Sequence, residues 1–222
     1  PFIKNLHGNK DSAYAKYMGD AIFKVPTPLM LDKIVTAMDG MYEQAAQLSN
    51  TDIRGDIYEY LLSKLATAGV NGQFRTPRHI IRMMVDLMQP RADDVICDPA
   101  CGTAGFLVAA GEYLRENRKQ EVFFDRKNKD HYMNHMFHGF DMDRTMLRIG
   151  AMNMMTHGVD NPFIEYRDSL SDQNPDKDKY SLILANPPFK GSLDYDIVST
   201  DLLKLCKTKK TELLFLALFL RM

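Results

Sequence analysis

The chain has 222 residues, of which 45% are hydrophobic and 26% charged, a composition typical of globular proteins and unlike that of disordered or low-complexity chains. Its 28 basic and 29 acidic residues almost cancel, so bulk charge does not attract nucleic acid, and any contact with DNA needs a local patch or a partner. Three cysteines, no signal segment and no apolar run longer than Leu213–Leu220 predict a cytoplasmic chain without a membrane span, which needs roughly 18 apolar residues.

The first third of the chain is predicted to be helical. Apolar residues recur at helical spacing over residues 29–48 and again over 56–68, where residues 50–52 provide a capping-type start. The turn Gly69–Gly72 then ends the pattern. We predict an N-terminal helical domain over residues 1–72, with either a packing role alone or a surface for a partner or nucleic acid.

From residue 73 onward, strands alternate with helices. We predict a helix whose N-cap is Thr76 and whose first residue is Pro77, ending at Gln89-Pro90. Short strands are predicted at 93–98, 135–141, 163–166 and 180–185, with helices at 106–114 and from Asp143, as a cap, to His157-Gly158. This alternation predicts an α/β fold with a doubly wound, Rossmann-like parallel sheet over residues 73–222.

The first strand leads into a turn of small residues. Ligands of doubly wound sheets lie past the carboxyl ends of the strands, and a turn containing Gly102 and Gly105 lets the backbone come close to a ligand. The turn lacks the G-x-G-x-x-G spacing of dinucleotide sites. Asp98 would repel a phosphate but can pair with an ammonium group, so the turn favours a ligand that carries an amino acid.

Two further acidic residues follow the next strands. Asp141 suits a ribose diol, because a carboxylate accepts two hydroxyl hydrogen bonds, and Asp168 suits an adenine amino group. The alternative for each is a solvated loop carboxylate. Three such residues at successive strand ends together predict S-adenosylmethionine as the cofactor.

The fourth strand ends in Asn186-Pro187-Pro188-Phe189. Two prolines stiffen the backbone, and the Asn186 side-chain oxygen and the Pro187 carbonyl can accept from one amino group. Phe189 offers a ring face to a planar base. An aromatic amine is a poor nucleophile, and two acceptors aimed at its hydrogens stabilise the positive charge that grows on nitrogen. The alternative is a proline turn that only ends the strand.

Three segments in this order carry a resemblance to a known family. They are Gln-Phe-Arg-Thr-Pro-Arg at 73–78, Asp-Pro-Ala-Cys-Gly-Thr-Ala-Gly-Phe-Leu at 98–107 and Asn-Pro-Pro-Phe at 186–189. The chain resembles the N6-adenine DNA methyltransferases and, more narrowly, the modification subunit of type I restriction-modification systems, to which residues 52–62 are also similar. The resemblance runs over residues 50–190, with helical context before it.

The resemblance implies a role for each segment. It implies that Asn186, Pro187, Pro188 and Phe189 are the catalytic residues that hold a flipped adenine. It gives Asp141 the ribose contact, whereas Asp168 is a cofactor residue on the strand-end argument alone. The other cofactor-binding residues that it implies are Gln73, Phe74, Arg75, Thr76, Pro77, Arg78, Asp98, Ala100, Gly102, Thr103, Ala104 and Gly105.

Several positions depart from the family pattern. Arg75 stands where many relatives have an aromatic residue, Ala104 where many have glycine, and Lys190 where glycine is frequent. The resemblance also implies a sheet of seven strands, whereas four are predicted here. Since the chain starts at Pro1 and stops at Met222, we expect a fragment whose methyltransferase fold is incomplete at its C-terminal end.

The resemblance also implies partners. These are DNA, a specificity subunit that reads the target sequence, an endonuclease subunit, and a second copy of the modification subunit. Two alternatives stay open, namely a methyltransferase that acts on a protein glutamine amide or an RNA base, and a cofactor-binding scaffold. The protein-amide and RNA enzymes lack the segment at 73–77. We expect no metal, since His131, His135 and His138 do not share a helical face, and Cys97 and Cys101 have no second pair.

Overall fold

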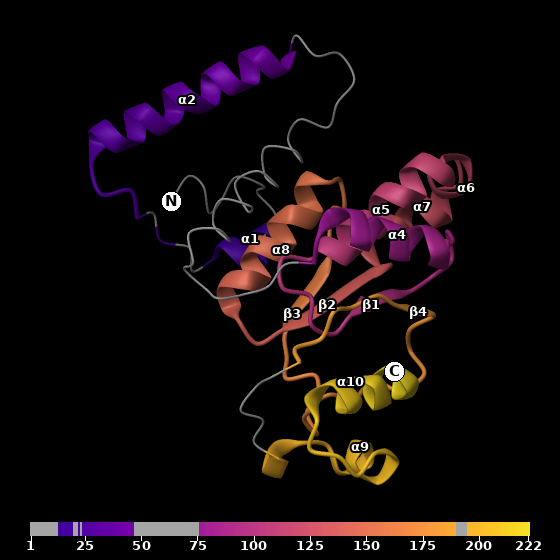
Figure 1. Ribbon diagram of the computed structural model, residues 1–222. Coiled ribbons are helices and arrows are strands. Elements are labelled where there is room, and N and C mark those ends of the chain that lie inside the picture. Colours follow the sequence, from indigo (N-terminus) through magenta and orange to yellow (C-terminus); the bar gives the residue numbers. More distant parts are fainter. Residues whose placement is uncertain (1–12, 20–21, 23, 47–75, 190–194) are drawn as a thin grey trace.

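The computed structural model describes residues 13–19, 22, 24–46, 76–189 and 195–222 (Figure 1). The described helices are α1 (Ala13–Met18), α2 (Pro28–Ala46), α4 (Arg78–Met88), α5 (Gly105–Asn117), α6 (Lys119–Phe123), α7 (Arg126–Asn134), α8 (Arg144–Thr156), the 3₁₀ helix η2 (Tyr195–Ile197), α9 (Thr200–Leu205) and α10 (Thr211–Arg221). The described strands are β1 (Ile96–Asp98), β2 (Phe137–Asp141), β3 (Phe163–Tyr166) and β4 (Leu182–Ile183).

The four strands form one parallel sheet in the order β3-β2-β1-β4. The chain builds outward from β1 through β2 to β3 and then crosses back to place β4 on the other side of β1. Helices α4, α5 and α8 lie on one face of the sheet, and α9 and α10 lie on the other (Figure 1). The predicted doubly wound parallel sheet is therefore confirmed, and the strand order reverses between β1 and β4.

Both faces of the sheet are buried. Side chains alternate between the faces of a strand, and the two hydrophobic clusters divide accordingly. Ile96 and Phe137 belong to the cluster under α5 and α8, whereas Cys97 and Phe140 belong to the cluster under α9 and α10. Burial on both faces is the arrangement expected of a parallel sheet, and it leaves the strand ends as the places where polar groups gather.

Helix α8 begins and ends where its sequence predicts. The Asp143 carboxylate accepts hydrogen bonds from the backbone N–H groups of Thr145 at 2.7 Å and Met146 at 3.2 Å, so the predicted N-cap is confirmed. At the other end, Gly158 adopts a φ of 76°, a left-handed conformation that glycine favours after a helix. Helix α8 thereby returns the chain to the start of β3.

The start of α4 differs from the prediction. Pro77 occupies the N-cap position, and no side chain caps the helix, so the predicted Thr76 N-cap is wrong. The physical reason is that the helix begins one residue later, with the Pro77 carbonyl as its first acceptor, which leaves the Thr76 hydroxyl outside the cap. The hydroxyl accepts a hydrogen bond from the side chain of Asn186. The predicted end at Gln89 is confirmed, since Gln89 adopts a φ of 50° and closes the helix with a bond to the Val85 carbonyl.

One N-terminal helix is tied to the sheet. The Tyr17 hydroxyl accepts from the Ile164 N–H of β3 at 3.0 Å and donates to the Ile164 carbonyl. The Arg148 side chain of α8 donates to the Tyr17 carbonyl at 3.0 Å. The helix predicted over 29–48 is confirmed as α2, whereas the helix predicted over 56–68 and the boundary at 72 lie outside the described residues.

Three helices and two strand lengths escaped the sequence reasoning. Helices α6 and α7 occupy a polar stretch for which no helix was predicted, and α9 was not predicted either. Strands β1 and β4 span three and two residues, where six were expected in each. None of the helices in the described part of the chain combines the length and apolar character that crossing a bilayer requires.

Candidate active site

The neighbouring strands β1 and β4 bring two predicted segments to one edge of the sheet. Ile96 pairs with Leu182 and Cys97 with Ile183 in parallel register, and the Leu184 N–H donates to the Cys97 carbonyl at 3.0 Å. The pairing therefore continues past β4. As a result, the turn that begins at Asp98 and the segment that begins at Asn186 leave the sheet at the same edge, at the point where the strand order reverses.

The turn after β1 has an unusual backbone that is fixed by β2. Gly102 and Ala104 adopt φ values of 50° and 61°, in the left-handed region that glycine tolerates best. The Gly102 N–H donates to the Asp141 carboxylate at 2.9 Å, and the Cys101 N–H donates to the Phe140 carbonyl at 2.9 Å. Helix α5 begins directly after the turn, with its N-terminus at the same edge of the sheet.

Asp98 lies beneath this turn. Its residue is only 1% exposed, and its carboxylate accepts from the Ala100 N–H at 3.0 Å. Burial raises the pKa of this carboxyl to about 7, and the nearby charge of Asp141 adds to the rise. Because the Asp98 carboxylate is so little exposed, a cationic group beyond the turn would be attracted by its charge without forming a direct ion pair with it.

Asp141 joins β2 to the turn. One carboxylate oxygen accepts from the Asp143 N–H at 2.8 Å, and the other accepts from the Gly102 N–H at 2.9 Å. Each carboxylate oxygen has a second lone pair, so both retain the capacity to accept from a diol. The side chain is half-buried at the sheet edge, and its predicted ribose contact stays a prediction.

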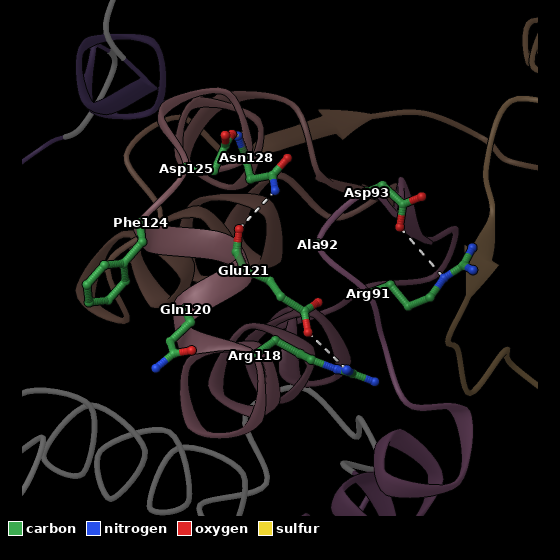
Figure 2. Close-up of a pocket in the computed structure, with 9 residues that line it drawn as sticks. All are labelled: Arg91, Ala92, Asp93, Arg118, Gln120, Glu121, Phe124, Asp125 and Asn128. Atoms are coloured by element: carbon green, nitrogen blue, oxygen red, sulfur yellow. Dashed lines mark hydrogen bonds and ion pairs between the residues drawn. The ribbon is translucent and has the colours of Figure 1, made fainter.

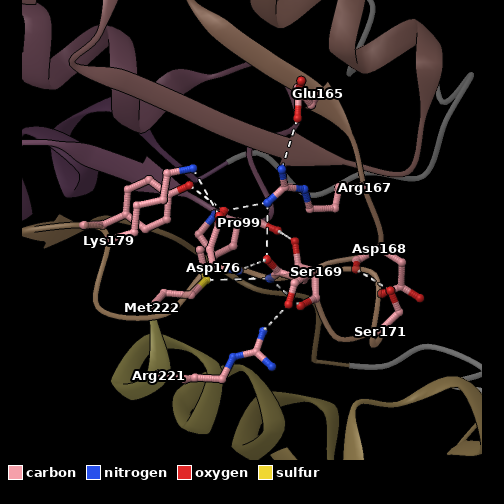
Figure 3. A network of polar contacts seen from close by, with 12 residues as sticks. Pro99, Glu165, Arg167, Asp168, Ser169, Ser171, Asp176, Lys179, Arg221 and Met222 are labelled. Carbon is pink, nitrogen blue, oxygen red and sulfur yellow. Dashed lines mark hydrogen bonds and ion pairs between the residues drawn. The ribbon is translucent and has the colours of Figure 1, made fainter. Parts of the chain in front are cut away.

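Asp168 lies in a loop that is bonded to the same turn. Its carboxylate accepts from the Leu170 N–H at 3.0 Å. The neighbouring buried Ser169 donates from its hydroxyl to the Pro99 carbonyl at 2.6 Å, and the Asn174 amide donates to the Ser169 carbonyl at 2.9 Å (Figure 3). The loop after β3 and the turn after β1 therefore form one connected unit.

An ionic network supports that unit. The Arg167 guanidinium contacts the Asp176 carboxylate at 2.6 Å and the Glu165 carboxylate at 3.1 Å (Figure 3). It also stacks 3.9 Å from the centroid of the Phe140 ring, at the end of β2. The Arg221 guanidinium of α10 donates to the Asn174 carbonyl at 3.2 Å, which links the C-terminal helix to the same loop.

The segment after β4 is exposed rather than buried. Phe189 is 67% exposed, so its ring is available to a planar ligand from solvent. The Asn186 side-chain amide donates to the Thr76 hydroxyl at 2.9 Å, across 110 positions of sequence. Pro187 is half-buried, and Pro188 is exposed. Two segments predicted to serve cofactor and base therefore meet through their side chains.

The remaining predicted cofactor residues divide into three groups. Ala100, Thr103 and Gly105 lie half-buried in the turn, beside the residues already described. Arg78 begins α4, and its guanidinium lies 3.5 Å from the Glu112 carboxylate of α5. The residues that lie outside the described part of the chain are Gln73, Phe74 and Arg75.

Sequence reasoning missed Asn153, Gly150 and Ser169, which all contact the turn. Asn153 of α8 is fully buried, and its amide donates to the Thr103 carbonyl at 2.9 Å. Gly150 faces the same turn, since a Cβ atom there would lie 3.0 Å from the Gly102 carbonyl oxygen. The one sequence signal that could have identified Asn153 is a lone asparagine in a Met-rich helix. No sequence signal distinguished Ser169.

A cavity lies at the opposite end of the sheet. It has a volume of about 600 Å³ and includes Arg91 and Asp93, which precede β1 (Figure 2). Its charged groups pair with one another, with 3.7 Å between Arg91 and Asp93 and 3.1 Å between Arg118 and Glu121. This cavity is at the amino ends of the strands, away from the edge where doubly wound sheets bind ligands.

The histidines and cysteines weighed as metal ligands have other surroundings. His131 lies 2.7 Å from the Asp94 carbonyl, and His138 lies 3.0 Å from the His135 carbonyl. Cys97 and Cys101 are free and buried. Within the part of the chain that the structure describes, no group of three or more His, Cys, Asp or Glu side chains is arranged to hold a metal ion.

Comparison with known proteins gives consistent matches. The family model described as N-6 DNA Methylase matches residues 49–222. The Type I restriction enzyme EcoEI methylase subunit of Escherichia coli is 32% identical, with 99% of this chain and 45% of that protein covered. The EcoKI methylase subunit of Escherichia coli strain K12 is 28% identical, with 79% of this chain and 35% of that protein covered.

Solved structures agree with these matches. A crystal structure described as a modification subunit of a type I restriction enzyme from Vibrio vulnificus YJ016 has a TM-score of 0.76 and 26% identity. The alignment covers 99% of this chain and 46% of that one. The methyltransferase subunit from Streptococcus thermophilus, at 20% identity and a TM-score of 0.66, shares the fold. This chain thus spans less than half the length of these relatives.

Proposed function

Because this chain belongs to the N-6 DNA methylase family, we propose that it is the part of a type I modification subunit that binds S-adenosylmethionine and directs its methyl group to N6 of adenine in DNA. One observation carries the proposal. The turn at Asp98 and the Asn-Pro-Pro-Phe segment at Asn186 follow adjacent parallel strands and leave the sheet at the same edge.

The residues around the turn fit the proposed cofactor. Burial raises the pKa of the Asp98 carboxyl to about 7, and a nearby ammonium group would stabilise its charged form. Asp141 retains acceptor capacity for ribose hydroxyls, and Asp168 lies on the connected loop for the adenine amino group. When bound, S-adenosylmethionine supplies an electrophilic methyl group on its sulfonium.

The residues after β4 fit an extruded base. The Asn186 side-chain oxygen and the Pro187 carbonyl serve as two acceptors for the hydrogens of the adenine amine. These acceptors favour the nitrogen geometry that attack requires and stabilise the developing positive charge, so no strong base is needed. The exposed Phe189 ring holds the base by stacking, and positioning supplies much of the rate.

The proposal includes the assembly in which the subunit acts. A separate specificity subunit reads the DNA sequence, an endonuclease subunit joins, and two modification subunits are present in each complex. The net charge of −1 supports this division of labour, because bulk charge does not attract DNA to this chain. The helical domain over 1–72 and the methyltransferase domain over 73–222 belong to the same proposal, as does the cytoplasm as its compartment.

The test is methyl transfer by the complete modification subunit reconstituted with a specificity subunit. Radiolabelled S-adenosylmethionine is incubated with genomic DNA from a strain that lacks the system, and the labelled nucleosides are identified by mass spectrometry after digestion. We expect N6-methyladenine, and we expect no label in parallel reactions with RNA or total protein. Label in a glutamine amide or an RNA base contradicts the DNA substrate. Tight cofactor binding without labelled product identifies a scaffold.

A further inference from the structure

We infer that Thr76 is a positioning residue for the catalytic amide of Asn186, an inference that rests on the proposed function. The observation is the 2.9 Å hydrogen bond from the Asn186 amide nitrogen to the Thr76 hydroxyl oxygen. By holding the amide nitrogen, Thr76 keeps the amide oxygen available as the acceptor that faces the target amine. Through Asn186, the Thr76 side chain then serves the half of the site that binds the base rather than the half that binds the cofactor.

The amide of Asn186 needs such a restraint. An asparagine amide presents an acceptor on one side and two donors on the other, and a half-turn about its last bond exchanges them. With the donors turned toward the target, an N–H group would face an N–H group and the acceptor would be lost. Since Asn186 is exposed, packing does not fix this choice, and the hydrogen bond to Thr76 holds the amide in the orientation that the structure shows.

Thr76 is built to supply a fixed partner. The following Pro77 confines the backbone of Thr76 to an extended conformation, and a β-branched side chain has few χ1 rotamers. The Pro77 carbonyl accepts from Ile80 at 2.9 Å and Ile81 at 3.1 Å, so the hydroxyl precedes a well-formed helix. Thr76 is half-buried, and its bond to the exposed Asn186 lies at the surface, where a ligand can reach it.

The same helix rests on the cofactor half of the site. Ile81 of α4 packs so closely on Gly105, the first residue of α5, that a Cβ atom there would lie 3.3 Å from the Ile81 Cδ1 atom. Helix α5 follows directly from the turn at Gly102. The hydrogen bond to Asn186 therefore joins the base half of the site to a helix that packs on the cofactor half. This contact fixes the position of one half relative to the other.

The Thr76 hydroxyl is not used by the helix that follows it. Pro77 occupies the N-cap position of α4, so Thr76 precedes the cap, and no side chain caps the helix. The Thr76 hydroxyl oxygen accepts from Asn186, which is a contact between two segments rather than within the helix.

The experiment separates this role from cofactor binding. The complete modification subunit, reconstituted with its specificity subunit, is prepared as wild type, Thr76→Val and Thr76→Ser. For each, kcat is measured at saturating DNA and cofactor, and the cofactor Kd is measured by calorimetry. We expect Thr76→Val to lower kcat at least tenfold with the cofactor Kd within threefold of wild type. We expect Thr76→Ser, which keeps the hydroxyl, to stay within threefold in both.

Each other outcome has a defined meaning. A raised cofactor Kd with wild-type kcat at saturation in Thr76→Val assigns the hydroxyl to the cofactor and overturns the inference. Equal losses in the valine and serine variants also overturn it, because only the hydroxyl is proposed to matter. If Thr76→Val does not fold, as judged by thermal unfolding, Thr76→Ala takes its place. An inactive wild-type complex refutes the proposed function itself, whereas an active wild type with an active Thr76→Val refutes the inference alone.

Discussion

The two halves of the proposed site are built in opposite ways. The turn after β1 is held by hydrogen bonds from several directions, with Asp141, Ser169 and Asn153 all bonded to its backbone. The segment after β4 lies open, since Phe189 is 67% exposed and the Asn186 amide is anchored to Thr76 alone among the contacts that the structure describes.

This contrast matches the two ligands proposed. A small cofactor is bound best by a preformed backbone cradle, because a rigid site loses little conformational entropy when it binds. A base that leaves a DNA duplex arrives from solvent on a large partner, so its binding segment has to be accessible. The comparison predicts that changes in the turn alter cofactor binding and stability, whereas changes after β4 alter the rate of methyl transfer.

The largest effect is expected from Asn186→Ala. Removing the amide oxygen takes away one of the two acceptors for the target amine, a loss that typically lowers kcat by about 10²–10³-fold. The side chain is exposed, so the free energy of unfolding and the cofactor Kd should change little. The measurements are kcat for methyl transfer and calorimetry with S-adenosylmethionine.

A matched control tests whether the loss is specific to the site. Asn117 at the end of α5 also has an amide that donates a hydrogen bond, to the Tyr113 carbonyl at 3.1 Å, but it lies in the helix that leads away from the turn. Asn117→Ala should retain wild-type kcat. Turnover within threefold of wild type in Asn186→Ala would remove the amine-acceptor role and, with it, the contrast between the two halves.

The next effect concerns stability and comes from Asp98→Asn. The folded state holds the proton of Asp98 up to about pH 7, whereas an unfolded chain releases it near 3.8. Between these values the folded state binds more protons, so the free energy of unfolding of the wild type falls as pH rises, and the loss is complete above about pH 7. Asparagine does not titrate and can still accept from the Ala100 N–H.

Urea denaturation of both proteins at two pH values measures this effect. At pH 8 we expect Asp98→Asn to unfold with a free energy roughly 2–4 kcal/mol above that of the wild type, and near pH 4 we expect the two to agree. A wild type that is as stable as the variant at pH 8 would show that the buried carboxylate carries no such cost.

The same substitution has the opposite effect on cofactor binding. The negative charge of Asp98 attracts the proposed ammonium, so Asp98→Asn should raise the cofactor Kd at least tenfold at pH 8, about 1.4 kcal/mol. Because the free wild-type protein protonates Asp98 below about pH 7, its affinity should fall as pH decreases from 8 to 6, and the gap to the variant should narrow. Calorimetry at both pH values gives these affinities, and unchanged affinity at pH 8 would contradict the assigned pocket.

Much of the α/β region could be predicted because its signals are local. Four apolar strands, the first three of them separated by helices, and Asp143 before a helix each reflect preferences of neighbouring residues. Helices α6 and α7 were missed because their stretch is polar and has no clear apolar face. For α7 the main local signal is the N-cap Asp125, whose carboxylate accepts from the Asn128 N–H.

The parts of the site that could not be predicted depend on contacts across the chain. Asn186 and Thr76 are 110 positions apart, and Ser169 and Pro99 are 70 apart. The local pattern predicted Thr76 as an N-cap, which was wrong because the helix begins one residue later, whereas the bond from the distant Asn186 amide to the Thr76 hydroxyl had no local signal. The strand ends indicated where the site lies, whereas the restraints that shape it appear only when the sheet brings the loops together.

The smallest effect is expected from Ser169→Ala, which loosens the turn without touching the proposed ligand. The substitution leaves the buried Pro99 carbonyl without the hydroxyl that bonds it at 2.6 Å, so the free energy of unfolding should fall by about 1–2 kcal/mol. Because the turn is part of the proposed cofactor cradle, the cofactor Kd should also rise severalfold.

Ser199→Ala is the control, since Ser199 is equally buried but its hydroxyl accepts from Arg221 of α10. It should lose comparable stability and keep the cofactor Kd. Equal cofactor affinities in the two serine variants would mean that the cradle does not depend on the loop after β3, and that the two halves differ less than their hydrogen bonds indicate.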